Sequence, residues 1–345
     1  MDRIFSKAPQ ARAFAAVALL PAVLLILGSG GGWPLWLGFL WIAGVSQTAD
    51  TLIARGFPDA ETEDFPLSDT ALCLIAAAHF ALLIVALRAF ASDALTTPER
   101  IALFLASGMY FGQVSNATAH ELIHRSHRAL FRLGAGTYVS LLFGHHTSAH
   151  RLVHHIHVAT DNDPNTARMG ESFWHFFPRA WIGSFRAGLV AEQTRAARSG
   201  RMNPYVWWVS GGIACIILTA ASLGPRTALT YVALCLYAQA QLMLSDYVQH
   251  YGLRRQNRDG RPEPVGPQHS WDARHPLSSL MMVNAPRHSD HHAHPTRAYP
   301  ALRLSREAHP RPILPYSLPV MGAIALIPPL WRRIMDRRVA RMQSR

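Results

Sequence analysis

The sequence predicts an all-α integral membrane protein in which six transmembrane helices carry a histidine-rich cytoplasmic cap that holds a dimetal site. Three observations lead to this fold class. Apolar runs close to the ~20 residues that cross a bilayer core recur along the chain. Arginines gather in two long polar segments beside these runs. All of the 19 histidines except His79 fall between residues 120 and 309, within the same polar segments.

The apolar runs predict spans at residues 13–28, 34–54, 70–90, 101–118, 205–223 and 228–248. The first run could be a signal peptide, but no clear small-residue cleavage site precedes a soluble domain, so a membrane helix is favoured. A glycine-rich hinge at residues 30–32 separates the first two spans, and Gly224 with Pro225 turns the chain between the last two. We interpret residues 1–345 as one membrane-embedded domain, with the short apolar run 320–330 as an interfacial or packing helix.

Arginine placement predicts the orientation of these spans. Segments 119–204 and 249–345 hold most of the arginines and are expected to form the cytoplasmic cap, whereas the intervening outer loops are short and carry little charge. Both termini are then cytoplasmic, in a bacterial inner membrane. The net charge of +12 comes almost wholly from arginine, since Lys7 is the only lysine. These arginines adjoin apolar spans instead of forming a separate basic domain, which argues against a nucleic-acid partner.

The histidines recur at metal-ligand spacing. His120 and His124 lie four residues apart, which places both imidazoles on one helix face. The same step recurs from His150 to His154, which predicts a shared face, and His155 adds a neighbour. His288, His291 and His292 have i, i+3, i+4 spacing, and His250 ends the sixth span. Nine imidazoles are too many for one metal and about right for two, and an all-nitrogen site suits iron or copper as well as zinc. The nine candidate ligands are His120, His124, His150, His154, His155, His250, His288, His291 and His292.

Other readings of the histidines remain open at this point. Glu121 within His120-Glu-Leu-Ile-His124 could be the base of a zinc protease, but that site needs only one further ligand and leaves six grouped imidazoles unexplained. A metal transporter would need ionisable residues along a path through the spans, which offer few. The histidines outside the groups are expected to be hydrogen-bonding residues: His79, His127, His145, His146, His157, His175, His269, His275, His294 and His309.

The three cysteines, Cys73, Cys215 and Cys235, lie inside apolar runs. None forms a C-x-x-C pair, so a disulfide framework and a cysteine-ligated iron–sulfur cluster are improbable. If the protein performs redox chemistry, its electrons must come from another protein.

At these motifs the sequence resembles the membrane-bound alkane 1-monooxygenase (alkane hydroxylase) family, within the larger group of histidine-box desaturases and hydroxylases. The residues that carry the resemblance are His120-Glu-Leu-Ile-His-Arg125, His150-Arg-Leu-Val-His-His155, His250-Tyr-Gly252 and Arg287-His-Ser-Asp-His-His-Ala-His-Pro-Thr-Arg297. Ala149 and Val153 stand where the family usually has glutamate and glycine. Such departures leave every histidine in place and leave open a branch acting on alkyl-aromatics or terpenes.

The resemblance implies a non-haem di-iron centre held by the nine histidines. With O2 as co-substrate it would hydroxylate a terminal or benzylic C–H bond of a hydrophobic substrate, an alkane or alkyl chain, drawn from membrane lipid. The alternative within the same superfamily is a fatty-acyl or lipid desaturase or hydroxylase. Electrons would come from rubredoxin or a ferredoxin-type donor with its NAD(P)H reductase, in agreement with the cysteine pattern.

Histidine ligands need hydrogen-bond acceptors that fix their tautomers. Acidic residues near the motifs are the candidates: Glu121, Asp161, Asp163, Asp246 and Asp290. We expect Glu121 and Asp290 to be the best of them because they lie within motifs.

Overall fold

A computed structural model describes residues 2–54, 67–258, 260–304 and 311–343. The helices in chain order are α1 (Asp2–Leu27), α2 (Trp33–Leu40), α3 (Ser46–Ala54), α4 (Ser68–Ala91), α5 (Thr97–Met109), α6 (Asn116–Ile123), α7 (Arg128–Ser140), α8 (His146–Ala149), α9 (His155–His157), α10 (Phe173–Ser199), α11 (Tyr205–Leu223), α12 (Pro225–His250), α13 (Pro276–Met281), α14 (His288–Ala293), α15 (Leu318–Ala325) and α16 (Pro328–Gln343). Three π-helical segments join them, at Trp41–Val45, Tyr110–Ser115 and His150–His154. Two 3₁₀ turns, Pro267–His269 and Tyr299–Ala301, and an antiparallel pair of two-residue strands, β1 (Asn257–Arg258) and β2 (Arg261–Pro262), complete the fold.

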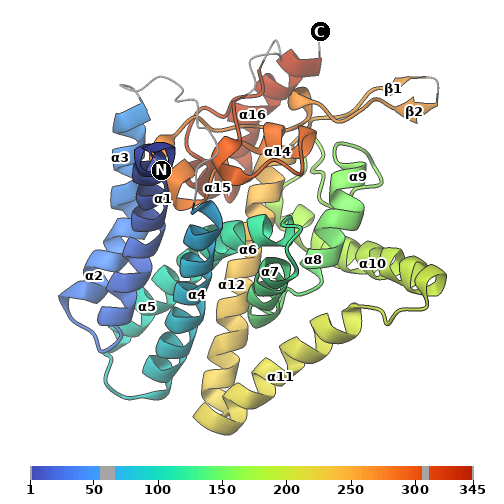
Figure 1. Ribbon diagram of the computed structural model, residues 1–345. Helices are drawn as coiled ribbons and strands as arrows, with labels where there is room; N and C mark the ends of the chain where they lie inside the picture. The colour runs from blue at the N-terminus through green and yellow to red at the C-terminus, as the bar shows by residue number, and fades with distance from the viewer. Residues whose placement is uncertain (1, 55–66, 259, 305–310, 344–345) are drawn as a thin grey trace.

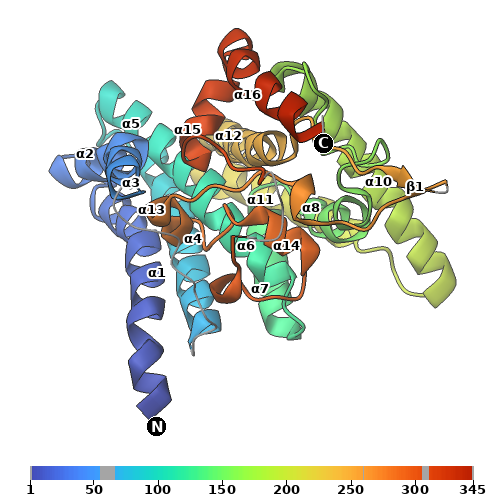
Figure 2. The ribbon, with the colours of Figure 1, turned by 90° about the horizontal axis from the view of Figure 1, so that it is seen from above.

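The long helices run up and down in one bundle, with α12 near its middle and α11 splayed at its side (Figure 1). The start of α1 and the end of α16 lie at the same end of this bundle. Viewed from that end, α13, α14, α15 and α16 lie across the bundle helices (Figure 2). The histidine motifs of α6, α8, α9 and α14 are at this end too, so the fold gathers them beneath the C-terminal segments.

Three helices of the described chain are long and apolar enough to cross a membrane, namely α4, α11 and α12. They contain the predicted spans 70–90, 205–223 and 228–248, which are confirmed as helices of membrane-crossing length. The apolar part of α1, Arg12–Leu27, is shorter. The predicted spans 34–54 and 101–118 lie in helices that π-helical segments interrupt, Trp41–Val45 in one and Tyr110–Ser115 in the other. The sequence periodicity carried no sign of these wider turns.

At the end of the bundle away from the histidine motifs, the carboxylate of Glu99 bonds to two loops. Glu99 Oε2 accepts the backbone N–H and the hydroxyl of Thr96, at 3.0 and 2.6 Å, which caps the start of α5. Glu99 Oε1 accepts the backbone N–H of Gly32 at 2.9 Å. Gly32 has a φ of 80°, which is accessible to glycine at little cost. The two loops at this end are therefore held to each other.

Residues 119–204 were expected to form only a cap, and α7 departs from that expectation. It descends beside α4 and α6, and its last residue, Ser140, bonds to His79 Nε2 at 2.8 Å in the middle of α4. Ser140 also accepts the hydroxyl of Tyr231, on α12, at its backbone oxygen. Gly134 permits the close approach, because a Cβ there would lie 2.8 Å from the carbonyl oxygen of Ala119. Small residues at helix contacts have this effect in membrane bundles.

The C-terminal helices close the histidine-bearing end. The apolar run 320–330 forms α15 and the start of α16, and α15 packs on α12. Trp331 is fully buried, and the Tyr251 hydroxyl donates to Asp336 Oδ1 at 2.6 Å. Gly252 has a φ of 71°, and a Cβ there would lie 2.8 Å from a methyl group of Val339. The glycine that follows His250 and Tyr251 is therefore required both by its backbone and by the approach of α16.

Candidate metal centre

The structure gathers the nine candidate ligands into two adjacent groups. The first group contains His120, His124, His150, His155 and His291, and the second contains His154, His250, His288 and His292. Within each group one ring nitrogen per residue lies within 4.8 Å of the corresponding nitrogen of every other member. Segments far apart in the sequence supply each group, so the arrangement is a product of the fold.

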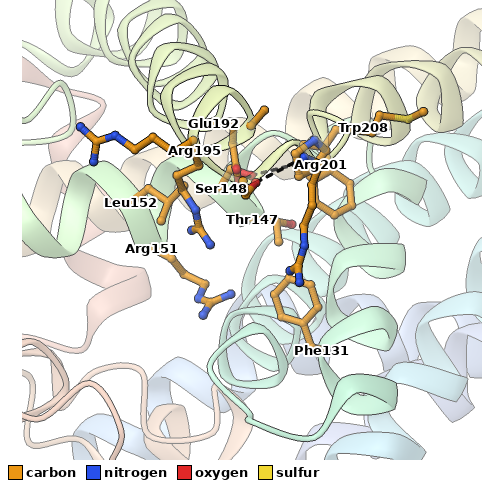
Figure 3. Close-up of a pocket in the computed structure, with 14 residues that line it drawn as sticks. Phe131, Thr147, Ser148, Arg151, Leu152, Glu192, Arg195, Arg201 and Trp208 are labelled. Carbon is orange, nitrogen blue, oxygen red and sulfur yellow. Dashed lines mark hydrogen bonds between the residues drawn. The ribbon is translucent and has the colours of Figure 1, made fainter.

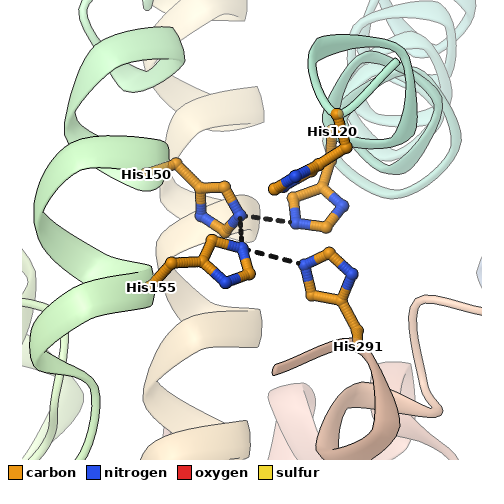
Figure 4. A group of neighbouring side chains, drawn as sticks. His120, His150, His155 and His291 are labelled. Carbon is orange, nitrogen blue, oxygen red and sulfur yellow. Dashed lines mark hydrogen bonds between the residues drawn. The ribbon is translucent and has the colours of Figure 1, made fainter. Parts of the chain in front are cut away.

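In the first group the imidazole Nε2 atoms point at one another from α6, the π-helical segment, α9 and α14 (Figure 4). The Nε2 of His150 lies 2.8 Å from that of His120 and 2.9 Å from that of His155, and His155 Nε2 lies 3.1 Å from that of His291. A separation of about 3 Å is expected for nitrogen ligands that each sit about 2.1 Å from one ion. The geometry therefore fits a metal at the point where these atoms converge.

The second group repeats this geometry at the end of α12. His288 Nε2 lies 3.0 Å from the Nε2 atoms of both His250 and His292. His154 Nε2 is buried and has no hydrogen-bond partner among the described residues, and the same is true of His124 Nε2 in the first group. Buried polar atoms are normally paired, so these unpaired nitrogens also fit a metal ligand role.

The histidines of the second motif, His150, His154 and His155, are divided between the two groups in an unexpected way. Four-residue spacing predicted that His150 and His154 share a face, but His150 belongs to the first group and His154 to the second. The segment between them is π-helical, and the N–H of His155 bonds to the carbonyl oxygen of His150, five residues back. This wider turn aligns His150 with His155 and directs His154 elsewhere. On α14, likewise, His291 joins the first group while His288 and His292 join the second.

One carboxylate bonds directly to a candidate ligand. Asp163 Oδ2 accepts His154 Nδ1–H at 2.9 Å and the Thr166 hydroxyl at 2.6 Å, and its Oδ1 accepts the backbone N–H of Asn165 at 3.0 Å. Donation from Nδ1 leaves the Nε2 of His154 as the nitrogen with a free lone pair. Asp246 lies behind this pair, where it accepts the Asn165 side-chain amide at 2.6 Å.

The two carboxylates that the sequence favoured make other bonds. Glu121 accepts the backbone N–H of Tyr299 at 3.2 Å and lies 3.9 Å from the guanidinium of Arg125. Asp290 pairs with Arg297 and with His294, which is not a member of either group. Asp161 is exposed and pairs with Arg254. Asp163 thus makes the contact with a ligand imidazole that the sequence led us to expect of Glu121 and Asp290. The Ser270 hydroxyl lies 3.4 Å from His250 Nδ1, and the sequence did not indicate this contact.

Four of the other histidines make the expected side-chain hydrogen bonds, namely His79 to Ser140, as described above, and three that pair with carboxylates. His175 bonds to Glu171, His269 to Glu263 and His294 to Asp290, each at 3.0 Å or less. His145 and His146 are buried beside Phe143, and His146 also lies next to the His150 ring. His309 lies outside the described residues.

Comparison with known proteins decides the family. The profile of the fatty acid desaturase family matches residues 98–325, which include all nine candidate ligands. Alkane 1-monooxygenase 1 of Alcanivorax borkumensis is 32% identical over 337 residues, which cover 92% of this chain and 81% of that protein. Alkane 1-monooxygenase of Ectopseudomonas oleovorans is 32% identical over 337 residues, 92% of this chain and 82% of that protein. The chain belongs to the alkane 1-monooxygenase family.

The family resemblance inferred from the histidine motifs is thus confirmed. A more distant relative has a different name: the xylene/toluene monooxygenase hydroxylase component of Pseudomonas putida is 27% identical over 223 residues, 62% of this chain and 57% of that protein. The two alkane 1-monooxygenases named above align over more of the chain than the xylene/toluene relative does.

Burial keeps most of the imidazoles in this alkane 1-monooxygenase family member in the state that binds metal. It lowers the pKa of His120 to about 3 and lowers the pKa of His124, His150 and His155 well below the ordinary value. Neutral imidazole coordinates metal, so no proton has to be displaced from these rings near pH 7. His154 differs: burial lowers its pKa, but the charge and hydrogen bond of Asp163 outweigh that effect and raise it.

A small cavity reaches both histidine groups. Its volume is about 50 Å³, and it lies between the π-helical segment Tyr110–Ser115, α6, α12 and the loop after α13. His120 of the first group and His288 of the second both line it. The rest of the wall is mixed. Its apolar side chains are Ala117, Leu242, Met282, Ala285 and Leu318, and its polar ones are Gln113, Asn116, His146, Ser245, Asp246 and Gln249. An apolar group held here would lie beside one candidate ligand of each group.

Proposed function

We propose that this protein is a membrane-bound, O2-dependent monooxygenase that hydroxylates a hydrophobic substrate at a di-iron centre. The observation that carries the proposal is the convergence of nine imidazoles into two groups with ligand-like spacing. His120, His124, His150, His155 and His291 would hold one iron, and His154, His250, His288 and His292 the other. Bound iron would supply the reaction of O2 with two electrons and two protons, in which one oxygen atom is inserted into an unactivated C–H bond and the other leaves as water.

The protein's own residues would hold and orient the reactants. Ala117, Leu242 and Leu318 in the cavity wall would bind an alkyl group through apolar contact. Asp163 holds the His154 ring through its Nδ1–H, so that Nε2 faces the second group. Burial of the imidazoles would keep bulk water away from the site, which limits side reactions there.

The proposed substrate is an alkane or alkyl chain, attacked at a terminal or benzylic carbon. Support for the alkane comes from the names of the relatives that align over most of this chain. The name of the xylene/toluene relative supports the benzylic position. An apolar substrate partitions into lipid and would reach the cavity from among the bundle helices.

The proposed electron source is an external protein, rubredoxin or a ferredoxin-type donor with its NAD(P)H reductase. The three cysteines of the chain are free thiols, with Cys235 buried and Cys73 and Cys215 partly buried. The arginine-rich end of the bundle suits an acidic donor, and such association would weaken with salt.

For the topology we propose six membrane passes in one domain, residues 1–345, with both termini on the cytoplasmic side of a bacterial inner membrane. The membrane-length helices α4, α11 and α12 and the helical runs of α1, residues 33–54 and residues 97–123 support the six passes. The common end of α1 and α16 supports the shared side of the termini.

Labelled oxygen provides the test of the reaction. The purified protein in liposomes, with a donor, its reductase, NADH and ¹⁸O2, is given a medium-chain alkane and an alkylbenzene in separate reactions. A primary or benzylic alcohol that carries one ¹⁸O atom is expected. An alkene without ¹⁸O would instead identify the desaturase alternative. Peptide cleavage that needs neither O2 nor reductant, and that Glu121→Gln abolishes, would identify the zinc protease.

A further inference from the structure

A second, larger pocket lies on the other side of the helix that carries the second histidine motif. Its volume is about 420 Å³, and it opens between the C-terminal part of α10, the start of α11 and the segment 147–152. Arg151, Arg195 and Arg201 direct their guanidinium groups into the same space (Figure 3), and Arg198 also lines the pocket. The catalytic proposal makes no use of this pocket.

The positive charge in this pocket is poorly compensated. The guanidinium groups of Arg195, Arg198 and Arg201 form no hydrogen bond or ion pair with the described residues, and that of Arg151 lies 5.2 Å from the centre of the Phe131 ring. Among the residues that line the pocket, Glu192 alone carries a carboxylate. Four cations facing one anion favour binding of an anionic ligand.

Hydrogen bonds connect the residues that form the floor of the pocket, Ser148, Glu192 and Trp208. The Ser148 hydroxyl donates to Glu192 Oε1 at 2.7 Å, and the Trp208 indole N–H donates to Ser148 Oγ at 3.0 Å (Figure 3). Glu192 is only 8% exposed, so its carboxylate belongs to the floor. The arginines form the wall above this floor and supply the donors for a ligand.

Trp208 also lines an apolar groove beside the pocket. A second hollow of about 200 Å³ shares Trp208 and runs along α11, with Phe185, Val209, Ile213 and Ile216 in its wall. The membrane-length segment of α11 is only 11% buried in the protein, so lipid would cover most of it. A charged pocket at the polar end of a lipid-facing helix thus adjoins a groove of the right chemistry for an acyl chain.

We propose that the pocket and the groove together bind one anionic glycerophospholipid. Its phosphate headgroup lies among Arg151, Arg195 and Arg201, and one acyl chain lies in the groove beside Ile213 and Ile216. Basic pockets between membrane helices bind anionic headgroups in this way. Free phosphate would use only the arginines. A folded acidic protein would reach the arginines but not the groove between α10 and α11. This inference rests on the proposed membrane location and is independent of the proposed chemistry.

The bound lipid would act on the metal centre through the chain segment that both share. Arg151 lies between His150 and His154 in sequence, and Ser148 lies two residues before His150. A headgroup that binds Arg151 therefore restrains the segment that presents ligands to both histidine groups. Because a ligand bound only to the folded state stabilises that state, anionic lipid should raise the thermal midpoint and slow the loss of metal.

The experiment measures lipid binding by native mass spectrometry on the delipidated, detergent-purified chain. Phosphatidylglycerol, phosphatidylcholine and inorganic phosphate are titrated separately. The test variant is Arg195→Gln with Arg201→Gln. The matched control is Arg186→Gln, since Arg186 is also exposed on α10 but does not line the pocket. Gly212→Leu tests the groove, because a Cβ at Gly212 makes only an ordinary contact of 3.4 Å with Leu142 and the longer side chain would fill the hollow.

We expect one phosphatidylglycerol per chain, with phosphatidylcholine at least tenfold weaker. The double arginine variant should lose about 30-fold in phosphatidylglycerol affinity, and Arg186→Gln less than twofold. Gly212→Leu should weaken phosphatidylglycerol about tenfold at an unchanged thermal midpoint without lipid. Equal losses in the test and control variants would overturn the proposal. Inorganic phosphate that binds as tightly as the lipid, with no effect of Gly212→Leu on lipid binding, would also overturn it.

Discussion

Asp163 provides a direct test of how the protein orients its proposed ligands. Replacing it with asparagine preserves the shape of the side chain but removes one of two acceptor oxygens. In the wild type both oxygens accept: Oδ2 from His154 Nδ1–H and the Thr166 hydroxyl, and Oδ1 from the Asn165 N–H. In Asp163→Asn the amide NH2 must face one of these donors, so either His154 or the loop loses its partner.

The size of the effect follows from these contacts. Loss of a carboxylate that orients a ligand histidine lowers metal affinity by about 10- to 100-fold. This factor corresponds to roughly 1.4–2.7 kcal/mol of binding free energy. The first group does not contact Asp163, so we expect the loss to fall on one metal per chain.

The assay is competition for iron by a chelator of known affinity, followed by the metal that remains bound to the detergent-purified protein. The control is Asp161→Asn, two residues away, because the Asp161 side chain is 86% exposed and pairs with Arg254. Asp163→Asn should release one iron at about 10- to 100-fold lower chelator concentration, and Asp161→Asn should behave as the wild type. If Asp163→Asn keeps both irons as tightly as the wild type, Asp163 does not orient a metal ligand.

Three further predictions concern the cavity, the C-terminal helices and pH. Ala117→Leu fills the cavity beside His120 and should lower turnover of a long alkane by about tenfold or more, with the iron content unchanged. Tyr251→Phe leaves Asp336 without its donor and should lower the free energy of unfolding by about 1–3 kcal/mol, measured by urea titration. Burial raises the pKa of Asp272 to about 7. The folded protein therefore keeps a proton on Asp272 that the unfolded chain releases above about pH 4. The free energy of unfolding of the metal-free protein should fall between about pH 4 and 7, by on the order of 1 kcal/mol per pH unit. Asp272→Asn should remove this slope, and a free energy of unfolding that rises with pH because of Asp272 would contradict the prediction.

The sequence carried more information about the ligands than about their arrangement. The four-residue step placed His120 and His124 on one face, and the structure does bring them into one group. The same step failed for His150 and His154, because the chain there is π-helical and the hydrogen-bonding pattern, not the residue types, decides which imidazoles align. Nothing in the local sequence distinguishes such a turn from an α-helix.

The acidic partner of the ligands was also beyond sequence reasoning. Asp163 lies in a loop without periodicity, and its position depends on Asn165 and Thr166 folding back onto it. Glu121 was favoured because it lies within a motif, yet a helix directs adjacent side chains to different faces and Glu121 instead bonds to Tyr299. The apolar runs, by contrast, predicted three membrane-length helices at nearly the residues where they occur, because that pattern is set by local hydrophobicity alone.

The central claim is that nine histidines hold two irons, and the metal content of His250→Ala tests it most directly. The wild type should contain two irons per chain. His250→Ala should retain close to one, because His250 belongs only to the second group. His175→Ala is the control, since His175 is exposed and bonds to Glu171. One zinc per chain in the wild type, unchanged in His250→Ala, would contradict the di-iron account.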